Sequence, residues 1–414
     1  MSKTRLAVIF GSRSVEHEVS VLTAQQVMAA ADPARYELVP IYITKRGDWL
    51  TGPALLDLET FRTPGRLDGL TRACLAPVPG QRALVRLDGG ALSLLRREQL
   101  PAIDVVFPTV HGTHGEDGTL QGLLELADLP YVGAGVAAAA VGMDKILAKA
   151  AFQAAGLPVV EGRWYTRSQY QASPDDVVAD IEAHLGYPCF VKPAVLGSSI
   201  GVARVTGRDD LRFALEVACS YGRRLLVERA VEPLMEINCA VLGNDTPIAS
   251  VCEQPVASGA VLSFADKYER GLKAVGAAKG PTAEQAAGGT KGGMASMQRI
   301  IPAPISEALS ARLQQLAIAA FRAIDGAGIA RVDFLVSPDE QQVFVNEINT
   351  MPGSLSFYLW DKPPTELTFP ALVDRLVELA LERHRDKQRT TYSHDTDLLR
   401  RAPQGLSAAA ARRR

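Results

Sequence analysis

Apolar and polar positions alternate in short blocks near the start of the chain. The largely apolar run Arg5–Phe10 ends at Gly11, and a polar stretch then leads into the apolar-rich segment Val19–Ala31. Short apolar runs that end at glycine are typical of buried strands, and longer periodic segments are typical of helices. We therefore expect a strand, a glycine loop and a helix here. The runs Glu37–Tyr42 and Ala102–Val110 predict further strands of the same α/β unit.

The same patterns predict elements along the rest of the chain. Helices are expected where apolar residues recur every three or four positions, at Thr119–Ala127, Met143–Ala155, Ile305–Ile324 and Leu367–His384. Gly156 follows the second of these helices, and glycine commonly ends a helix. Strands are expected at Pro188–Ala194 and Arg224–Ala230, and a hairpin at Ile329–Val336 and Gln342–Asn349 around the turn Ser337–Glu340.

Two segments have no periodicity. Arg270–Ser296 is rich in glycine, alanine and lysine, which predicts a mobile loop or a disordered insert. Arg385–Arg414 is charged, rich in alanine and terminal, which predicts a frayed or disordered tail.

Composition narrows the classes of function. The 414 residues include 44 basic and 46 acidic ones, so the chain lacks the basic excess of a nucleic-acid-binding protein. The five cysteines are widely spaced and form no C-x-x-C pair, which argues against a disulfide framework and a zinc site. No apolar segment has the ~18 residues of a membrane span. We expect a cytoplasmic protein without a nucleic-acid or membrane partner.

The predicted hairpin carries the strongest chemical pattern. Side chains alternate between the faces of a strand, so Arg331 and Asp333 share one face, and Glu347 and Asn349 share a face of the partner strand. Pairing of these faces would gather two carboxylates and an amide, which suit Mg²⁺ together with substrate phosphates. An equally good interpretation of this motif alone is a solvated face with ordinary ion pairs.

Two glycine-rich loops are further candidates. In Val191–Val202, Lys192 precedes a loop with Ser198 and Ser199, and such backbone and hydroxyl groups can cradle phosphate. No G-K-[ST] ending is present, so the loop is not a Walker A motif, and by itself it reads as a polar turn.

The loop His111–Gly118 holds two histidines, two acids and three glycines. Its histidines suggest zinc, but the glycines favour a substrate-lining loop, where backbone approaches a ligand closely. Glu16 opens a predicted helix, a place where it could simply compensate the helix dipole.

Taken together and in order, these motifs resemble those of the D-alanine–D-alanine ligase family. The matching stretches are Ser14–Ser20, His111–Gly122, Tyr131–Lys149, Val191–Val202, Leu226–Gly243, Asp266–Tyr268, Ala330–Phe334 and Val345–Ser354. The resemblance covers most of the chain from Arg5 to about Arg383. It implies an ATP-grasp fold of α/β (α+β) class, with an N-terminal Rossmann-like α/β domain at 1–132. A small central ATP-binding lobe is expected at 133–235, a C-terminal catalytic lobe at 236–385 with a lid insert at 264–300, and a tail at 386–414.

The resemblance also implies a ligand set. Asp333, Glu347 and Asn349 would hold two Mg²⁺ ions, with Mn²⁺ as an alternative. The residues implied to contact ATP are Lys145, Lys192, Ser198, Ser199, Glu228, Val231, Glu236 and, from the lid, Lys267.

For the amino acid substrates, the resemblance implies that Glu16 binds the ammonium group of the first D-alanine, in a network with Ser198 and Tyr268. His111 would line that site. Arg331 and the N–H group of Gly353 would form an oxyanion hole.

The activity implied is ATP-dependent ligation of two D-alanines through D-alanyl phosphate, for peptidoglycan precursor synthesis. Two stretches depart from the family pattern. The insert after Tyr268 is long, and the serine that usually binds the carboxylate of the second substrate has no unambiguous counterpart. Ser356 is the nearest candidate with suitable spacing, and Ser354 is the other.

Rival functions remain open from the sequence. They are D-alanine–D-lactate or D-alanine–D-serine ligation and ligation of another amino acid pair. Nucleotide binding without turnover is disfavoured by the intact set Glu16, Lys192, Arg331, Asp333, Glu347 and Asn349. A Rossmann dehydrogenase is disfavoured because no G-x-G-x-x-G follows the first strand. A homodimer is the default expectation for assembly.

Overall fold

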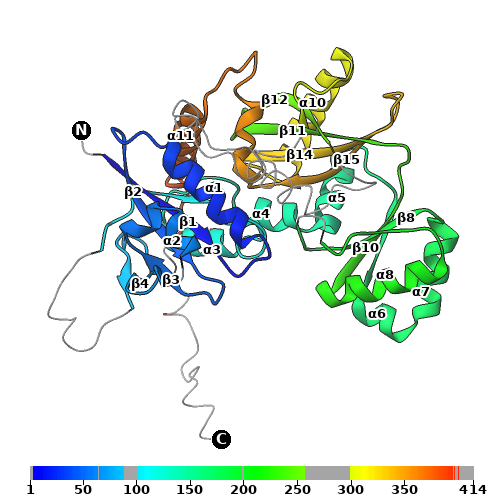
Figure 1. Cartoon of the computed structure of the whole chain (residues 1–414), viewed down its shortest axis with the longest axis horizontal. Coiled ribbons are helices and arrows are strands. Elements are labelled where there is room, and N and C mark those ends of the chain that lie inside the picture. Colours follow the sequence, from blue (N-terminus) through cyan, green and yellow to red (C-terminus); the bar gives the residue numbers. More distant parts are fainter. Residues whose placement is uncertain are drawn as a thin grey trace, which may run out of the picture.

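Three sheets, each with its own helices, organise the chain along its length (Figure 1). The computed structural model describes residues 3–63, 65–87, 100–197, 200–256, 299–394, 396 and 400. Ser198, Ser199, Lys267 and Tyr268, the whole of the predicted insert Arg270–Ser296 and most of the predicted tail lie outside the described residues.

The N-terminal sheet has the order β5-β4-β3-β2-β1-β6, and β1 pairs in parallel with both β2 and β6. This confirms the predicted strand–loop–helix start and its two partner strands. The elements of this unit are β1 (Thr4–Gly11), α1 (His17–Ala30), β2 (Tyr36–Ile43), β3 (Trp49–Thr51), η1 (Pro53–Leu56), α2 (Glu59–Arg62), β4 (Thr71–Cys74), β5 (Val85–Arg86), β6 (Val105–Pro108) and α3 (Thr119–Leu126).

A break at Asp144 follows the N-terminal unit. The helix expected at Met143–Ala155 is confirmed as α5 (Lys145–Ala154), and α4 (Val136–Met143), a helix that was not predicted, ends just before it. Asp144 has extended backbone angles, and its side chain accepts the N–H groups of Ile146 and Leu147. A side chain that caps a helix start in this way fixes where α5 begins and separates it from α4.

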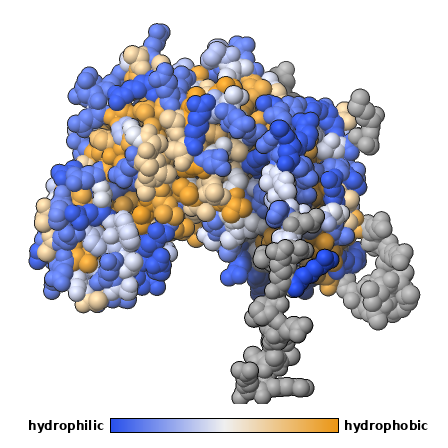
Figure 2. Space-filling model, turned by 180° about the vertical axis from the view of Figure 1, so that it is seen from behind, coloured by the Kyte–Doolittle hydropathy of each residue, from blue (hydrophilic) through white to orange (hydrophobic). Residues whose placement is uncertain are grey.

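The central lobe is a four-stranded antiparallel sheet of order β7-β10-β8-β9, at the opposite end of the molecule from the N-terminal sheet (Figure 1). The predicted strands are confirmed as neighbours, and three helices cover one face. The elements are β7 (Gly162–Thr166), α6 (Arg167–Ala172), α7 (Pro174–His184), β8 (Cys189–Pro193), β9 (Ala203–Val205), α8 (Arg208–Tyr221) and β10 (Arg224–Arg229). In Figure 2, from behind, polar residues cover much of this lobe, and apolar residues gather in the middle of the molecule.

The third sheet has the order β13-β12-β11-β14-β15 and is antiparallel throughout. Its elements are β11 (Met235–Gly243), β12 (Ile248–Pro255), β13 (Arg299–Ile300), α10 (Glu307–Ala323), β14 (Gly328–Val336) and β15 (Val343–Asn349). Helix α10 buries Leu313, Ala317 and Phe321 against one face of this sheet. The predicted hairpin is confirmed, and the opposite face stays available for polar side chains.

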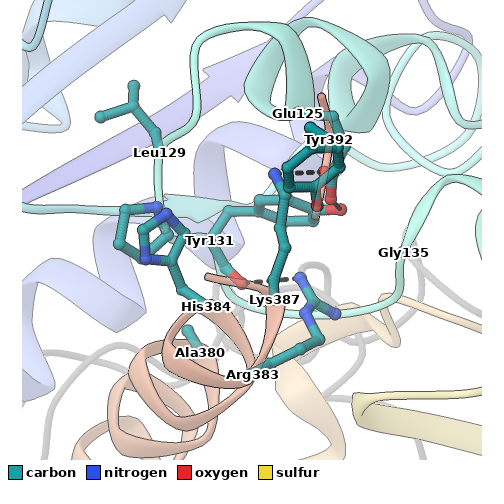
Figure 3. Close-up of a pocket in the computed structure, with 10 residues that line it drawn as sticks. Glu125, Leu129, Tyr131, Gly135, Ala380, Arg383, His384, Lys387 and Tyr392 are labelled. Carbon is teal, nitrogen blue, oxygen red and sulfur yellow. Dashed lines mark hydrogen bonds and ion pairs between the residues drawn. The ribbon is translucent and has the colours of Figure 1, made fainter. Parts of the chain in front are cut away.

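The 3-10 segment η4 (Gly353–Leu359) and the last helix α11 (Phe369–Lys387) connect the third sheet to the N-terminal unit. One hydrophobic core contains Phe10 from β1, Trp360 after η4 and Leu372 from α11. Near its end, α11 contacts the segment before α4, where Arg383 lies over the ring of Tyr131 at 4.4 Å (Figure 3).

Helix α11 ends three residues later than expected. Arg385–Lys387, which we assigned to a frayed tail, complete the helix. Lys387 forms an ion pair with Glu125, and Gln388 donates to Asp128, so the start of the predicted tail is fixed against the N-terminal unit.

Candidate active site

A row of polar residues crosses the third sheet. Glu347 of β15 lies opposite Asp333 of β14, Asp333 lies opposite Asn238 of β11, and Asn238 lies opposite Glu253 of β12. Residues at one register of neighbouring strands point to the same face. The sequence predicts the first two members of the row. Asn238 and Glu253 were missed because they stand within mostly apolar strands that were not predicted.

Asp333 lies at the centre of a hydrogen-bonded cluster. Arg331 donates from Nε to Asp333 Oδ1 (2.6 Å) and from Nη2 to Oδ2 (2.7 Å), and Asn349 donates from Nδ2 to Oδ2 (3.1 Å). Burial opposes the positive charge of Arg331, but Asp333 outweighs it and raises the pKa of the guanidinium well above its ordinary value. Lys145 lies 3.7 Å from Glu347, between Nζ and Oε2. The predicted convergence of these polar faces is present.

The chemistry of this cluster fits a magnesium site. Arg331 uses both oxygens of Asp333 and Asn349 also donates to Oδ2, so Oδ1 is the oxygen that keeps a lone pair for a cation. Since Nδ2 of Asn349 donates to Asp333, its Oδ1 is the atom left to bind a metal. Two carboxylates and an amide oxygen, completed by phosphate oxygens, match the preference of Mg²⁺. Among the described residues, no group of three or more His, Cys, Asp or Glu side chains is arranged to hold a metal by itself.

A second charged cluster joins the central lobe to α5. Glu228 of β10 accepts from Lys192 of β8 through Oε2 (2.6 Å), and its Oε1 lies 2.6 Å from Nζ of Lys149. Burial opposes the charge of Glu228, but the two lysines outweigh it and lower its pKa to about 2. Burial of Lys149 outweighs the attraction of Glu228 and lowers the pKa of that lysine. Lys149 was missed, because a single lysine in a predicted helix gives no sign of a buried partner.

Lys145, one of the expected phosphate-binding lysines, contacts two other parts of the site. Lys145 donates from Nζ to the carbonyl oxygen of Leu196 (2.6 Å), in the loop that follows Lys192. The amine of Lys145 therefore lies between that loop and Glu347, where phosphates would meet both.

A cleft of about 680 Å³ lies between the central lobe and the hairpin. Val231 lines it from the segment after β10, and Phe344 lines it from β15. Glu236, the third residue expected near adenosine, stands on β11 opposite Leu335 of β14. The central lobe and the hairpin thus form a concave space of the volume that small-molecule pockets commonly have. Val231 lines it, whereas Glu236, Lys145 and Lys192 do not.

Glycines crowd around the carboxylate of Glu16. A Cβ atom at Gly112 would lie 2.5 Å from Glu16 Oε2, and one at Gly197 would lie 2.8 Å from the same oxygen. Gly112 also has a φ of +69°, which favours glycine. Two separate glycine loops therefore enclose Glu16, which is 6% exposed.

Glu116 of the same loop is a buried connector. Its Oε2 accepts the N–H group of Gly112 (2.8 Å), and its Oε1 accepts the N–H group of Met351 (2.9 Å). Burial, with a smaller contribution from the charge of Glu16, raises the pKa of Glu116 to about 8. Sequence reasoning gave this residue no role, although it stands in the motif that we singled out.

His111 uses both ring nitrogens. Nδ1 lies 2.9 Å from the carbonyl oxygen of Met351, which can only accept, so Nδ1 carries the proton. Nε2 then accepts from Thr23 Oγ1 (2.8 Å), and Thr23 Oγ1 accepts the N–H group of Ser354 (3.3 Å). Burial lowers the pKa of His111 to about 4, so the ring is neutral. The histidine connects α1 to η4, and Thr23 is a residue that we missed.

The turn after Gly353 has an unusual backbone. Ser354, Leu355 and Ser356 have φ values of 51°, 53° and 46°, which side-chain-bearing residues rarely adopt. Ser356 is fully buried, and its Oγ has no hydrogen-bond partner within the described part of the chain. A capping role of Ser356 in this turn has no such bond to support it. Gly353 opens η4, which packs against β14, the strand that carries Arg331.

Family models match nearly the whole length of the chain. The model described as the N-terminus of D-ala D-ala ligase matches residues 5–134, and that of the C-terminus matches 151–287 and 290–378. The chain belongs to the D-alanine–D-alanine ligase family.

Relatives of this family align from end to end. A D-alanine–D-alanine ligase of Geobacillus thermodenitrificans is 39% identical over 95% of this chain and 100% of its own length. One from Chloroherpeton thalassium is 38% identical over 94% of this chain and 99% of its own length.

Solved structures give the fold. The D-alanine–D-alanine ligase of Coxiella burnetii superposes with a TM-score of 0.72 at 32% identity, covering 94% of this chain and 98% of that one. The VanG D-Ala:D-Ser ligase of Enterococcus faecalis has a TM-score of 0.73 at 27% identity, covering 92% and 100%. The fold of this D-alanine–D-alanine ligase family member is therefore the ATP-grasp fold, as predicted, and ATP use follows from the family. Among the described residues, no helix has the length and hydropathy needed to span a membrane.

Proposed function

We propose that this enzyme joins two D-alanine molecules through D-alanyl phosphate, releasing ADP and phosphate, for peptidoglycan precursor synthesis. The observation that carries the proposal is that Asp333 and Glu347 lie opposite each other on neighbouring strands. Arg331 and Lys145 lie beside them. The enclosed carboxylate of Glu16 supplies the matching site for an amino acid.

The first step needs the D-alanine carboxylate beside the γ-phosphate. Glu16 binds the ammonium group of that D-alanine, and His111 holds η4 in place through Thr23. Lys145 and Lys192 contact the phosphates, while Glu228 fixes Lys192 by the 2.6 Å hydrogen bond. Asp333, Glu347 and Asn349 would hold two Mg²⁺ or Mn²⁺ ions, which neutralise the charge of the phosphoryl group when bound.

The second step needs an oxyanion hole. The carboxylate is a poor electrophile until it is phosphorylated, and the amine of the second D-alanine then attacks the acyl carbon. Arg331 and the N–H group of Gly353 stabilise the developing negative oxygen, since preorganised donors act most strongly in a water-excluded site. Phosphate leaves with the bond electrons. Ser198, Ser199, Lys267 and Tyr268 keep their predicted roles in the phosphate loop and the lid.

The closest rival is the use of another second substrate, because a D-Ala:D-Ser ligase is among the structural neighbours. An assay of ADP release with ATP, D-alanine and a panel of D-amino acids and D-hydroxy acids decides between them. D-alanine alone should give the highest kcat/KM and yield the dipeptide. A higher kcat/KM for D-serine or D-lactate at the second site would replace the proposal. The homodimer and the cytoplasmic location stay predictions.

A further inference from the structure

The polar row of the third sheet ends in an ion pair that the proposed reaction does not use. Arg299 of β13 donates from Nη1 to Glu253 Oε2 (2.8 Å). Each carboxylate of the row thus has its own cation: Lys145 beside Glu347, Arg331 beside Asp333, and Arg299 beside Glu253. The first two cations serve the phosphates and the oxyanion in the proposed function.

The third pair is deeply buried. The side chain of Arg299 is 8% exposed, and that of Glu253 is fully buried. Removing two charges from water costs about as much as their attraction returns, so such a pair is a poor device for stability alone. Its position at the end of a functional row suggests a role in the reaction.

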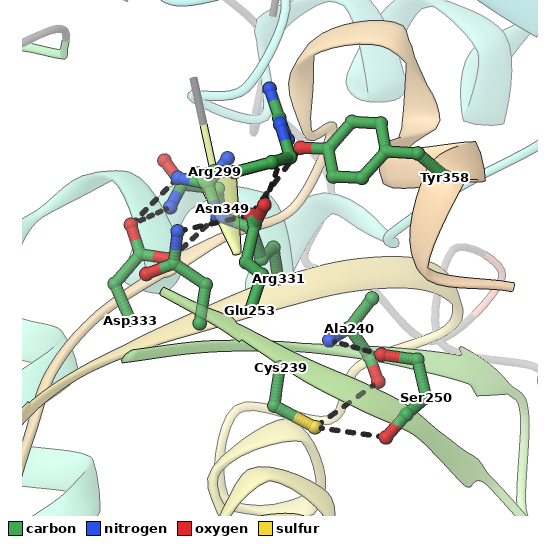
Figure 4. Close-up of polar contacts among 10 residues, drawn as sticks. Cys239, Ala240, Ser250, Glu253, Arg299, Arg331, Asp333, Asn349 and Tyr358 are labelled. Carbon is green, nitrogen blue, oxygen red and sulfur yellow. Dashed lines mark hydrogen bonds and ion pairs between the residues drawn. The ribbon is translucent and has the colours of Figure 1, made fainter. Parts of the chain in front are cut away.

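Neighbouring groups fix the orientation of Arg299. Its guanidinium lies over the ring of Tyr358 at 3.6 Å from the centroid (Figure 4). Glu253 Oε1 accepts from Asn238 (3.2 Å) and from the hydroxyl of Tyr358 (3.4 Å). The charge of Glu253 is therefore shared among three donors, which weakens its neutralisation of Arg299, and the aromatic ring holds the plane of the guanidinium.

The position of Arg299 relative to the reacting carbon determines which group of the substrates it can contact. Along the row, Glu347 lies at the end beside Lys145, Asp333 with Arg331 follows, and Glu253 with Arg299 lies at the far end. Figure 4 shows the pairs of Asp333 with Arg331 and of Glu253 with Arg299. The amine that displaces phosphate must approach the acyl carbon from a side that phosphate does not occupy. The segment η4, with Ser356 and Tyr358, packs against β12 at that end.

We propose that Arg299, held by Glu253 and Tyr358, binds the carboxylate of the amino acid that supplies the attacking amine. This proposal rests on the proposed function. A planar guanidinium pairs with a carboxylate with high geometric specificity. Arg299 is then a specificity-determining residue, which selects amines that bear a carboxylate over amines that lack one.

The test compares Arg299→Met with the wild type, using D-alanine and D-alaninamide as the attacking amine. D-alaninamide has the same amine but no carboxylate. Loss of a charge-assisted contact should raise the KM of the second D-alanine about 10- to 100-fold. The rate constant with D-alaninamide should not change, and neither should the KM for ATP. Hydroxylamine, which traps D-alanyl phosphate as the hydroxamate, reports the first step separately.

The outcomes separate the two proposals. Wild-type enzyme that forms no hydroxamate from ATP and D-alanine overturns the proposed function. Hydroxamate formation at the wild-type rate by Arg299→Met, with an unchanged KM for D-alanine, overturns the role of Arg299 alone. Equal losses with D-alanine and D-alaninamide also overturn it, because they indicate a packing role only.

Two further variants complete the test. Arg375→Met is the control, because Arg375 of α11 pairs with Glu378 and Glu382 at the surface, and it should behave as wild type. If Arg299→Met does not fold, Arg299→Gln replaces it with the same expected and contrary results, since glutamine can still donate to Glu253.

Discussion

Asp333 and Glu347 lie directly opposite each other on β14 and β15, and Arg331 donates to both oxygens of Asp333. A metal ion bound between these two carboxylates would share Asp333 with the guanidinium of Arg331. The same arginine therefore orients a metal ligand and faces the reacting carbonyl in the proposed reaction.

We predict that Asp333→Asn and Glu347→Gln each abolish turnover while the fold survives. Loss of metal-held charge stabilisation should cost several kcal/mol of activation free energy. Steady-state kinetics at saturating ATP and Mg²⁺, with thermal melting as the folding check, measures this. Asp175→Asn is the matched control, because Asp175 pairs with Arg212 at the surface. Near wild-type kcat in either site variant would refute the assignment.

Glu228→Gln should destabilise the fold in a pH-dependent way. The pKa of Glu228 is about 2, below its ordinary value of 4.5, because two lysines outweigh its burial. Its charge therefore contributes stability above pH 4.5, and this contribution is lost as pH falls toward 2. Removing one partner from a buried charged cluster costs about 3–5 kcal/mol.

Urea unfolding of both proteins at pH 7 and at pH 3 measures the difference. The gap in unfolding free energy should be large at pH 7 and smaller at pH 3. The KM for ATP should also rise in the variant, because Lys192 loses its positioning partner. A gap that does not change with pH would show that Glu228 acts by packing.

Glu116→Gln should alter the pH dependence of the first D-alanine site. The pKa of Glu116 is about 8, above its ordinary value of 4.5, so folded Glu116 is mostly protonated at pH 7. An ammonium group beside Glu16 favours the ionised form, so the KM for the first D-alanine should fall as pH rises from 6 to 8.5. This slope should flatten in Glu116→Gln.

The pH dependence of folding stability gives an independent test of the raised pKa of Glu116. Because the folded pKa is raised, the native state holds a proton that the unfolded chain has released between pH 4.5 and 8. Stability from this group therefore declines as pH rises through that window. The wild type should lose stability relative to Glu116→Gln over this range, and parallel curves would contradict the raised pKa.

Ser356→Ala should weaken binding of the second D-alanine. The buried Oγ lacks a hydrogen-bond partner among the described residues, and a bond to a carboxylate contributes about 1.5–3 kcal/mol. The KM for the second D-alanine should rise about 10- to 100-fold, while the KM for ATP stays constant. Ser354→Ala is the comparison, since Ser354 meets Thr23 through its backbone. Unchanged second-site KM and kcat in Ser356→Ala would make Ser356 structural.

The hairpin was predictable because its polar residues alternate, and alternation maps directly onto the faces of a strand. Asn238 and Glu253 belong to the same row, but no strand was predicted over either residue, so the alternation could not assign them to a face. Thr23 and Lys149 were missed for another reason. Their partners, His111 and Glu228, are far away in sequence and meet them only through the tertiary fold. The start of α5 was predicted two residues too early, because the capping side chain of Asp144 fixes it at Lys145.

The hydrophobic core that unites β1, Trp360 and α11 makes the N-terminal unit and the third sheet a single body. The central lobe, by contrast, has a separate core of its own around Val178, Val191 and Leu215. Its links to that body include Arg224 with Asp144 and Lys149 with Glu228, at one end of α5 and along its length. A hinge near Asp144 would carry Gly197 of this lobe away from Glu16, so that opening the nucleotide cleft would also open the first amino acid site.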